Sequence, residues 1–261
     1  MKRTLITGEI PFLPEQLINF IKSAKVYDSS CSPDARVYYI EKNGGFYLKT
    51  AQKNALKNEA EMLEYFHKKG LAPKVISYLS VEMDWLLTER VMGEDCTYST
   101  YLDQPQRLCD TIATLLRSLH ETAYSDCPIF NRTADYLNTA KRNYEKGIFD
   151  SELFTPDIQF PKASLAWNYL EANKQYLKND TLIHGDYCLP NIMLDNWRFS
   201  GFIDIGNGGV GDKHIDLFWG TWTLWFNLKT NKYRERFFDA YGRDRLEPEI
   251  LKVIAAAEVF G

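Results

Sequence analysis

The stretch that decides the fold reads His184-Gly185-Asp186-Tyr187-Cys188-Leu189-Pro190-Asn191, and Phe202-Ile203-Asp204 follows it along the chain. Phosphoryl transfer needs a carboxylate that orients the attacking hydroxyl and accepts its proton. It also needs two oxygen ligands that hold magnesium against the phosphates. Asp186 fits the first role, and Asn191 and Asp204 fit the second. The stretch therefore predicts a phosphoryl-transfer site with Asp186 as its catalytic base.

The spacing of these three side chains has a physical reason. A loop with Asp186 at its apex can turn back so that Asn191 enters the next strand, and a hairpin through Asn196-Trp197-Arg198 then returns Asp204 to the same side. Taken singly, each residue is better explained as a loop former, an N-cap or a turn residue. The ordered set favours the functional interpretation.

The chain before this stretch is dominated by strand patterns. Asn43-Gly44-Gly45 separates two short runs of aromatic and β-branched residues, which is typical of a hairpin. An amphipathic pattern with helical spacing follows and ends at Gly70. The predicted order is strand, strand, helix, strand, strand, over residues 36–40, 46–50, 54–69, 75–81 and 85–91.

Helical patterns dominate the rest of the chain. The predicted helices span residues 108–124, 134–147, 164–177 and 248–261, with short strands at 192–194 and 199–204. Gly93 in Met92-Gly93-Glu94-Asp95 supplies the flexibility of a hinge. The sequence thus predicts an α+β protein of two lobes: a β-rich N-terminal lobe, residues 1–93, and a mainly helical C-terminal lobe, residues 94–261.

The composition excludes several classes of partner. The 261 residues are 45% apolar and 25% charged, which suffices for a substantial core, and the net charge of −4 does not indicate a nucleic-acid surface. None of the five cysteines forms a Cys-x-x-Cys pair, so no disulfide framework or zinc site is expected. No apolar run is long enough for a signal peptide or a membrane span. The sequence therefore predicts a cytoplasmic protein with no nucleic-acid or membrane partner.

The pattern His-x-Asp-x-x-x-x-Asn, followed by an apolar pair and Asp, resembles the catalytic and metal segments of protein-kinase-like enzymes, specifically the aminoglycoside phosphotransferases. Ile183-His184-Gly185-Asp186, Pro190-Asn191-Ile192-Met193 and Ser200-Gly201-Phe202-Ile203-Asp204-Ile205-Gly206 are similar to the 3'-phosphotransferase branch. A weaker resemblance runs from about Ser32 to the C-terminal helix. It implies a bilobal protein-kinase-like fold, Mg²⁺ and ATP or GTP. It also implies transfer of the γ-phosphate to an aminoglycoside hydroxyl, the 3' one, which confers antibiotic resistance.

The same resemblance implies an ion pair that binds the nucleotide phosphates. Phe46-Tyr47-Leu48-Lys49 is a predicted strand ending in a lysine, and Glu59 lies on the helix that follows. In the family such a lysine binds the α- and β-phosphates and the helix glutamate positions it. Without the catalytic loop, both would be better explained as surface residues.

Other nucleotide contacts follow from the resemblance too. Ser32, in Ser32-Pro33-Asp34-Ala35-Arg36-Val37, resembles the turn over the phosphates, although no glycine-rich motif is present. The segment 87–91 resembles the linker that pairs with adenine, with the Glu89 carbonyl and the Val91 amide as the contacts and Tyr47 stacking on the base.

The acceptor region departs from the 3'-phosphotransferase pattern. An arginine commonly follows Asp-x-Gly in that branch, where this chain has Asn207, and charged positions on the next helix appear here as Trp222 and Asn227. The aromatic side chains in this region follow helical spacing, which favours core packing over ligand contact. They are Trp219, Trp222, Trp225 and Phe226.

A polycationic aminoglycoside requires carboxylates in its binding site. The candidates are Asp157, Glu258 and the terminal carboxylate of Gly261. The departures leave two alternatives open, a narrower aminoglycoside range and a different hydroxylated metabolite as the acceptor.

The segment Gly206-Asn207-Gly208-Gly209-Val210-Gly211-Asp212 is rich in glycine but lacks the Gly-Lys-Ser or Gly-Lys-Thr of a P-loop. It is interpreted as a flexible turn after Asp204. Asp212 and Asp216 are predicted to brace the catalytic loop or to cap a helix.

A metal-dependent phosphoesterase is a second hypothesis, because His184-Gly185-Asp186 and His214-Ile215-Asp216 form two His-x-Asp pairs. It leaves Asn191 and the pairing of Lys49 with Glu59 unexplained, so His184 is interpreted as holding the catalytic loop. A third hypothesis, a kinase fold without activity, predicts the loss of a catalytic or metal residue. None is missing.

Overall fold

Two units of different composition make up the chain in the computed structural model, which describes residues 3–150 and 158–261. One unit runs to Gly93 and also includes Met193–Gly206; the other comprises Glu94–Ile192 and Asn207–Gly261. Met193–Gly206 belongs to the first unit although it lies far along the chain, within the range expected for the C-terminal lobe.

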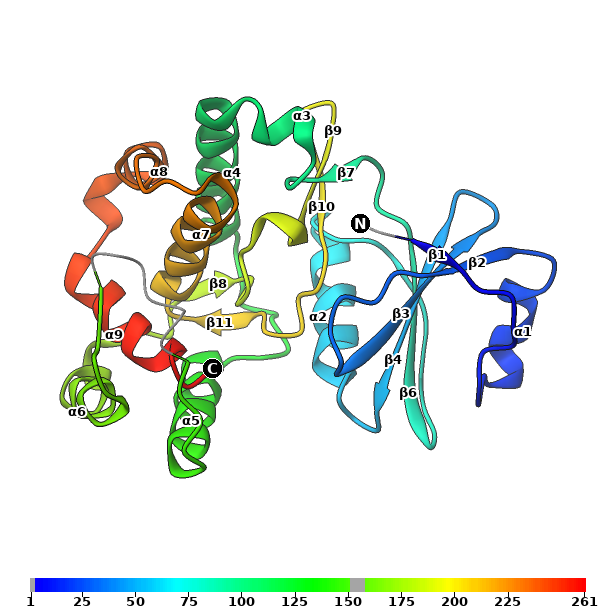
Figure 1. The fold of residues 1–261 in the computed structure, drawn as a ribbon, viewed down its shortest axis with the longest axis horizontal. Helices are drawn as coiled ribbons and strands as arrows, with labels where there is room; N and C mark the ends of the chain where they lie inside the picture. The colour runs from blue at the N-terminus through cyan, green and yellow to red at the C-terminus, as the bar shows by residue number, and fades with distance from the viewer. Residues whose placement is uncertain (1–2, 151–157) are drawn as a thin grey trace. The chain divides into compact units, whose positions relative to one another are not determined.

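A six-stranded antiparallel sheet forms the first unit, with the order β1-β2-β3-β4-β6-β5 (Figure 1). Its strands are β1 (Thr4–Leu5), β2 (Lys25–Asp28), β3 (Ala35–Glu41), β4 (Phe46–Gln52), β5 (Val75–Ser80) and β6 (Met83–Glu89). Two helices, α1 (Glu15–Ile21) and α2 (Lys57–Lys68), belong to the same unit. The predicted order over residues 36–91 is therefore confirmed.

The two faces of this sheet carry different chemistry because side chains alternate along each strand. On one face, Tyr38, Leu48 and Leu87 pack in a buried cluster with Leu17 of α1. Lys49, next to Leu48, points to the other face, where its ammonium group reaches α2. The alternation of side chains along β4 thus directs Lys49 toward α2.

The N-terminal strands and α1 were not predicted from the sequence. The segments β1 and β2 are two and four residues long, too short for a clear alternation of apolar and polar positions. They extend the sheet through pairing with β3, in which Tyr27 lies opposite Tyr39. Their existence depends on a neighbouring strand rather than on a local signal.

Met193–Gly206 contributes a hairpin to the first unit. Its strands β9 (Ile192–Asp195) and β10 (Arg198–Phe202) are neighbours in a small sheet. Asn196 and Trp197 between them both have positive φ, 50° and 67°, which is the signature of a two-residue type I′ turn. The hairpin expected around Asn196-Trp197-Arg198 is confirmed.

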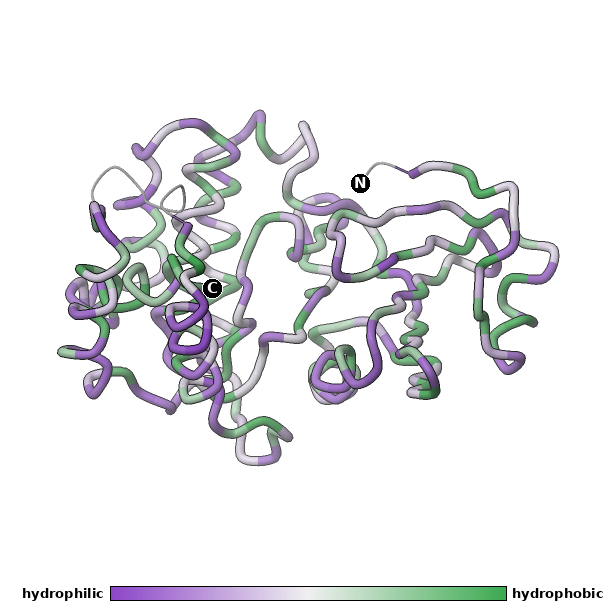
Figure 2. Tube along the Cα trace, turned by 60° about the horizontal axis from the view of Figure 1, so that its bottom comes forward, coloured by the Kyte–Doolittle hydropathy of each residue, from purple (hydrophilic) through white to green (hydrophobic). Residues whose placement is uncertain are grey.

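The second unit is mainly helical, and hydrophobic residues recur among hydrophilic ones along its helices (Figure 2). The helices are α3 (Ser99–Leu102), α4 (Pro105–His120), α5 (Arg132–Glu145), α6 (Ala163–Asn173), α7 (Lys213–Leu228), α8 (Arg234–Tyr241) and α9 (Pro248–Glu258). Three short strands are also present: β7 (Glu94–Asp95), β8 (Thr181–Ile183) and β11 (Gly209–Gly211). In the described part of the chain, no helix combines the length and hydropathy needed to span a membrane.

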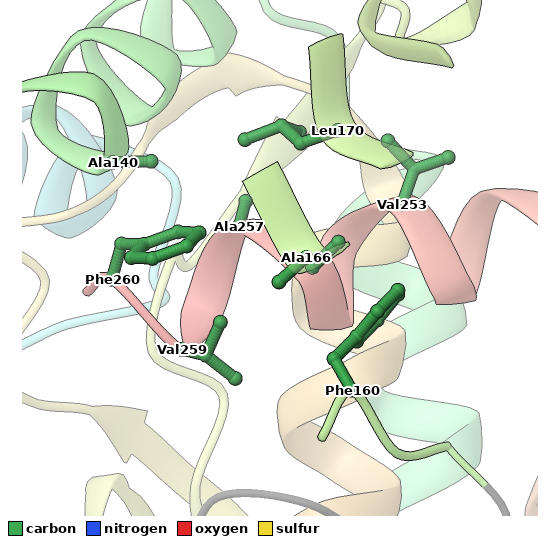
Figure 3. Packing of buried hydrophobic residues seen from close by; sticks show 9 residues of the cluster. Ala140, Phe160, Ala166, Leu170, Val253, Ala257, Val259 and Phe260 are labelled. Carbon is green, nitrogen blue, oxygen red and sulfur yellow. The ribbon is translucent and has the colours of Figure 1, made fainter. Parts of the chain in front are cut away.

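A buried hydrophobic cluster fixes the C-terminal segment. Phe260 belongs to a cluster that also contains Ala140 of α5, Ala166 of α6 and Val253 of α9, and it is fully buried (Figure 3). Its carbonyl oxygen accepts a hydrogen bond from Asn143 Nδ2 at 2.7 Å. The end of α9 is therefore anchored rather than free.

The prediction of a flexible turn over Gly206–Asp212 is wrong at its centre. Residues 209–211 form β11, which pairs antiparallel with β8 so that Gly211 lies opposite Thr181. A Cβ on Gly209 would lie 2.9 Å from the carbonyl oxygen of Ile129, and one on Gly211 would lie 2.7 Å from Ile183 Cδ1. Close approach of neighbouring groups therefore favours glycine at both positions, and Gly209 also has φ of +148°, which other residues rarely adopt.

Candidate active site

Asp186 lies in the loop between β8 and a 3-10 turn at Leu189–Asn191. Asn191 Nδ2 donates to Asp186 Oδ2 at 2.8 Å and to the Asp186 carbonyl oxygen at 3.0 Å. Asn191 ends the 3-10 turn, one residue before the strand that was expected to contain it. Because its amide nitrogen is directed at Asp186, its Oδ1 atom is the part that can ligate a cation.

Asp216 of α7 braces the backbone of this loop, as predicted. Its carboxylate accepts hydrogen bonds from the amides of His184 and Gly185, both at 2.7 Å. It also lies 3.1 Å from Nε2 of His120 and is completely buried. The backbone directly before Asp186 is therefore held by a buried carboxylate.

His184 is buried, and its Nδ1 lies 3.3 Å from the amide nitrogen of Asp186, which donates to it. Within residues 3–150 and 158–261, no group of three or more His, Cys, Asp or Glu residues is arranged to hold a metal ion. This geometry agrees with the interpretation of His184 as a residue that holds the loop.

Asp212 caps the N-terminus of α7, which is one of the two roles predicted for it from the sequence. It accepts from the amide of His214 at 2.8 Å and from the amide of Lys178 at 2.7 Å. Burial by itself would raise the pKa of Asp212, but the hydrogen bonds from His214 and Lys178 lower it below the usual value. The aspartate therefore remains ionised at the positive end of the helix.

Lys49, Glu59 and Asp204 meet in the first unit. Lys49 Nζ lies 2.8 Å from Glu59 Oε2 and 2.8 Å from Asp204 Oδ1. Burial acts to lower the pKa of Lys49, but the two carboxylates overcome this effect and raise it, so the lysine is cationic. Glu59 is buried, and burial raises its pKa above the usual value. The side chain of Asp204 is about half exposed.

The other residues assigned to the nucleotide also lie in the first unit. Ser32 is exposed in the turn between β2 and β3, and its Oγ accepts from the Asp34 amide at 3.1 Å. Glu89 ends β6, and Val91 is buried against Gly201 of β10. Glu89 and Val91 therefore lie where the chain leaves β6, an inner strand of the sheet.

Tyr47, predicted to stack on the nucleotide base, contacts other side chains of the protein. Its ring lies 5.3 Å from that of Tyr39, and its hydroxyl accepts a hydrogen bond from Arg3 at 2.8 Å. Arg3 also lies over the Tyr39 ring, 3.7 Å from the centroid. The N-terminal strand therefore reaches the same face of β4 as Lys49.

Of the three residues predicted from the sequence to bind the acceptor, Glu258 and Gly261 lie together, and Asp157 lies outside the described residues. Glu258 is buried at the end of α9 and accepts from Trp219 Nε1 at 2.8 Å. The amide of the exposed Gly261 donates to the Glu258 carbonyl oxygen at 2.8 Å. Burial raises the pKa of Glu258 to about 8, the charge of Asp186 adds to the rise, and hydrogen bonding to Tyr136 and Trp219 opposes it.

The aromatic run on α7 packs largely on itself. Trp222 stacks on Phe226 with ring centroids 4.9 Å apart, and it meets Trp219 edge-on at 5.3 Å. Phe226 remains 47% exposed, so the run is not wholly part of the core. Asn227, the other departure on this helix, donates to the carbonyl oxygen of Thr223 at 2.8 Å.

Sequence reasoning missed two residues that support the loop, His120 and Arg132. His120 ends α4 and contacts Asp216, and Arg132 begins α5 and contacts Asn207. A polar side chain at the end of an otherwise apolar helix face was the only local sign of His120. Nothing in the sequence near Arg132 indicated its partner.

The donor set is suited to magnesium. Asn191 offers an amide oxygen and Asp204 a carboxylate, and hard oxygen ligands of this kind bind Mg²⁺. Asp186 keeps a carboxylate oxygen, Oδ1, that Asn191 does not engage. Asn191 of the second unit and Asp204 of the first unit thus each carry an oxygen of the kind that Mg²⁺ binds.

Comparison with known proteins agrees with this chemistry. The chain matches the model of the "Phosphotransferase enzyme family" over residues 32–251. It is 51% identical over 250 residues to the "Probable aminoglycoside 3'-phosphotransferase" of Lactococcus lactis, covering 95% of each protein. It is 27% identical over 255 residues to the aminoglycoside 3'-phosphotransferase of Niallia circulans, covering 95% of this chain and 97% of that protein.

A solved structure shows the fold. The crystal structure of an aminoglycoside-3'-phosphotransferase of type VIII superposes with a TM-score of 0.77 at 23% identity, over 95% of this chain and all of that one. The chain therefore has the expected α+β, protein-kinase-like fold. Because the family model spans most of the sequence and the 51% identical relative is covered almost end to end, the chain belongs to the phosphotransferase enzyme family.

Proposed function

We propose that this protein transfers the γ-phosphate of ATP or GTP to the 3'-hydroxyl of an aminoglycoside antibiotic in the cytoplasm and so confers resistance. One observation carries the proposal. In a chain similar over 95% of its length to a 3'-phosphotransferase, the Asp186 carboxylate is held by Asn191 at 2.8 Å in a loop braced by Asp216. Such a carboxylate is positioned to receive the proton of an attacking hydroxyl.

The mechanism is a direct, in-line transfer. Asp186 orients the acceptor hydroxyl and accepts its proton, and no covalent enzyme intermediate is required. Lys49, held by Glu59, binds the α- and β-phosphates and draws charge from them. Asn191 and Asp204 would hold Mg²⁺, which neutralises charge on the phosphates when bound.

The first unit, around residues 1–93, serves as the nucleotide-binding lobe in this proposal. The Glu89 carbonyl and the Val91 amide pair with the base, Tyr47 stacks on it and Ser32 lies over the phosphates. A related solved structure of an aminoglycoside phosphotransferase, APH(3'')-Id, is described in complex with ADP and streptomycin, which supports a nucleotide and an aminoglycoside as joint ligands.

The second unit, around residues 94–261, serves as the acceptor lobe. Glu258, the terminal carboxylate of Gly261 and Asp157 bind the acceptor's amines. The anchoring of Phe260 in the hydrophobic cluster supports this assignment, because it holds Gly261 beside Glu258.

The test is magnesium-dependent nucleotide turnover by the purified protein, with kanamycin-like compounds that carry or lack the 3'-hydroxyl. We expect turnover only with the compounds that carry it. Turnover that is indifferent to this hydroxyl would contradict the 3' assignment, and hydrolysis of a simple phosphoester without nucleotide would favour the phosphoesterase.

A second candidate is phosphorylation of another hydroxylated metabolite of lower positive charge. It is favoured by Glu258, because a pKa of about 8 leaves this carboxyl mostly protonated at pH 7 and removes a negative charge that a polycation would use. If every aminoglycoside fails while the protein still binds ATP or GTP, this candidate replaces the first.

A further inference from the structure

Arg132, the first residue of α5, is joined to a residue 75 positions further along the chain. Its Nε donates to the carbonyl oxygen of Asn207 at 2.8 Å, and its Nη2 donates to Asn207 Oδ1 at 2.5 Å. Two parallel donors from one planar guanidinium fix both the backbone and the side chain of Asn207. This contact connects the start of α5 to the segment that follows Asp204 in sequence.

The guanidinium of Arg132 is largely buried, with 14% of the side chain exposed. Its carboxylate neighbour is Asp135, whose Oδ2 lies 3.7 Å from Nη1, and burial lowers the pKa of Arg132. A buried cation with a distant counter-charge is costly unless its donors are satisfied. The two acceptors of Asn207 are therefore the main compensation for burying this charge.

The same carbonyl oxygen of Asn207 lies against the catalytic loop. A Cβ on Gly185 would be 1.9 Å from this oxygen and 2.4 Å from the carbonyl carbon. Gly185 has φ of +82°, and its amide donates to Asp216 at 2.7 Å. Gly185 is thus confined between Asp216 on one side and the Asn207 carbonyl on the other, directly before Asp186.

We propose that Arg132 is a positioning residue for phosphoryl transfer, which rests on the function proposed above. By holding Asn207 against Gly185, the guanidinium limits where the loop can move and so keeps Asp186 in the orientation its role as base requires. Arg132 acts through Asn207 and does not contact the reacting groups. Small displacements of a catalytic group lower the rate strongly while leaving binding intact.

The test compares Arg132→Lys, Asn207→Ala and the double variant with two controls. Arg132→Lys keeps the charge but loses the planar pair of donors. Asn207 is exposed, and alanine keeps its backbone carbonyl, so Asn207→Ala tests the Nη2–Oδ1 half of the contact even where a change at Arg132 impairs folding. The controls are Asp135→Asn, which removes the carboxylate on the other side of the guanidinium, and Arg142→Lys, an exposed arginine on the same helix.

The first measurement is kcat and KM with ATP and kanamycin, together with the melting temperature. We expect Arg132→Lys to lower kcat about tenfold, with both KM values within about twofold of wild type. The double variant is no slower than the slower single variant, because both act through one contact. Both controls retain wild-type kcat.

The second measurement is amide hydrogen exchange of the segment around residues 183–188 in the free protein, which needs no acceptor. We expect faster exchange there in Arg132→Lys and Asn207→Ala but not in Asp135→Asn. Unchanged exchange, an unchanged kcat in an active enzyme, or losses that multiply in the double variant would overturn the inference. If wild type phosphorylates no aminoglycoside, the proposed function fails while the exchange result still decides the role of Arg132.

Discussion

Asp186 accepts a hydrogen bond from Asn191 at Oδ2, and its carboxylate is the proposed acceptor of the substrate's proton. Asp186→Ala removes the proton acceptor without touching the nucleotide residues. We expect turnover to fall by about a thousandfold or more, with nucleotide affinity within about twofold of wild type. Turnover assays and calorimetric titration with ATP measure the two quantities. Asp195→Ala, an exposed aspartate further along the chain, should retain activity; an active Asp186→Ala protein contradicts the assignment.

Lys49 forms ion pairs with two carboxylates of the first unit. Its Nζ lies 2.8 Å from Glu59 Oε2 and 2.8 Å from Asp204 Oδ1. Lys49→Met removes the positive charge and leaves Glu59 buried without it. We expect KM for ATP to rise about tenfold or more and kcat to fall, because a charge-assisted phosphate contact is lost. Lys53→Met, at an exposed lysine just beyond β4, is the control and should leave KM for ATP unchanged. An unchanged KM in Lys49→Met would exclude a phosphate role.

At the scale of an element, strand β11 requires glycine at position 209, because the backbone of Ile129 lies close to it. A Cβ on Gly209 meets the carbonyl oxygen of Ile129 at 2.9 Å, and the residue has φ of +148°. Gly147, after α5, has φ of +73° but nothing within 4 Å of a Cβ. We therefore expect Gly209→Ala to lower the free energy of unfolding by about 2–3 kcal/mol and Gly147→Ala by about 1 kcal/mol. Urea denaturation measures the difference; equal losses would mean that backbone conformation, not crowding by Ile129, decides the cost.

The stability of the whole molecule should depend on pH through Glu258. Its pKa is about 8 in the folded protein and ordinarily 4.5, so between these values the folded state holds a proton that the unfolded chain has released. Stability from this group is therefore complete below about pH 4.5 and is lost as the pH rises toward 8, at up to about 1.4 kcal/mol per pH unit.

Glu258→Gln removes this titration, so the variant should gain stability relative to wild type as the pH rises from 5 to 8. Denaturant unfolding at several pH values measures the gain. Glu249→Gln, at an exposed glutamate of the same helix, should follow wild type throughout. A constant difference between Glu258→Gln and wild type would show that Glu258 is ionised across this range.

The sequence by itself determined the features that depend on short spacings. Asn43-Gly44-Gly45 and Asn196 mark turns whose positive φ values the structure contains, since Gly and Asn adopt that conformation more readily than other residues. The order of Asp186, Asn191 and Asp204 predicted phosphoryl transfer because the chemistry requires those side chains within one loop and hairpin.

Only the tertiary structure decided the features that depend on distant partners. Gly209–Gly211 carries no strand pattern and becomes β11 because β8 lies beside it. Trp219 bonds Glu258 across 39 positions, and Arg132 bonds Asn207 across 75. Burial and pairing across such separations follow from how helices pack, and no local periodicity encodes them. Asp186 could therefore be proposed as the base, and Asp216 as a brace of its loop, from the sequence, whereas the contacts of His120 and Arg132 could not.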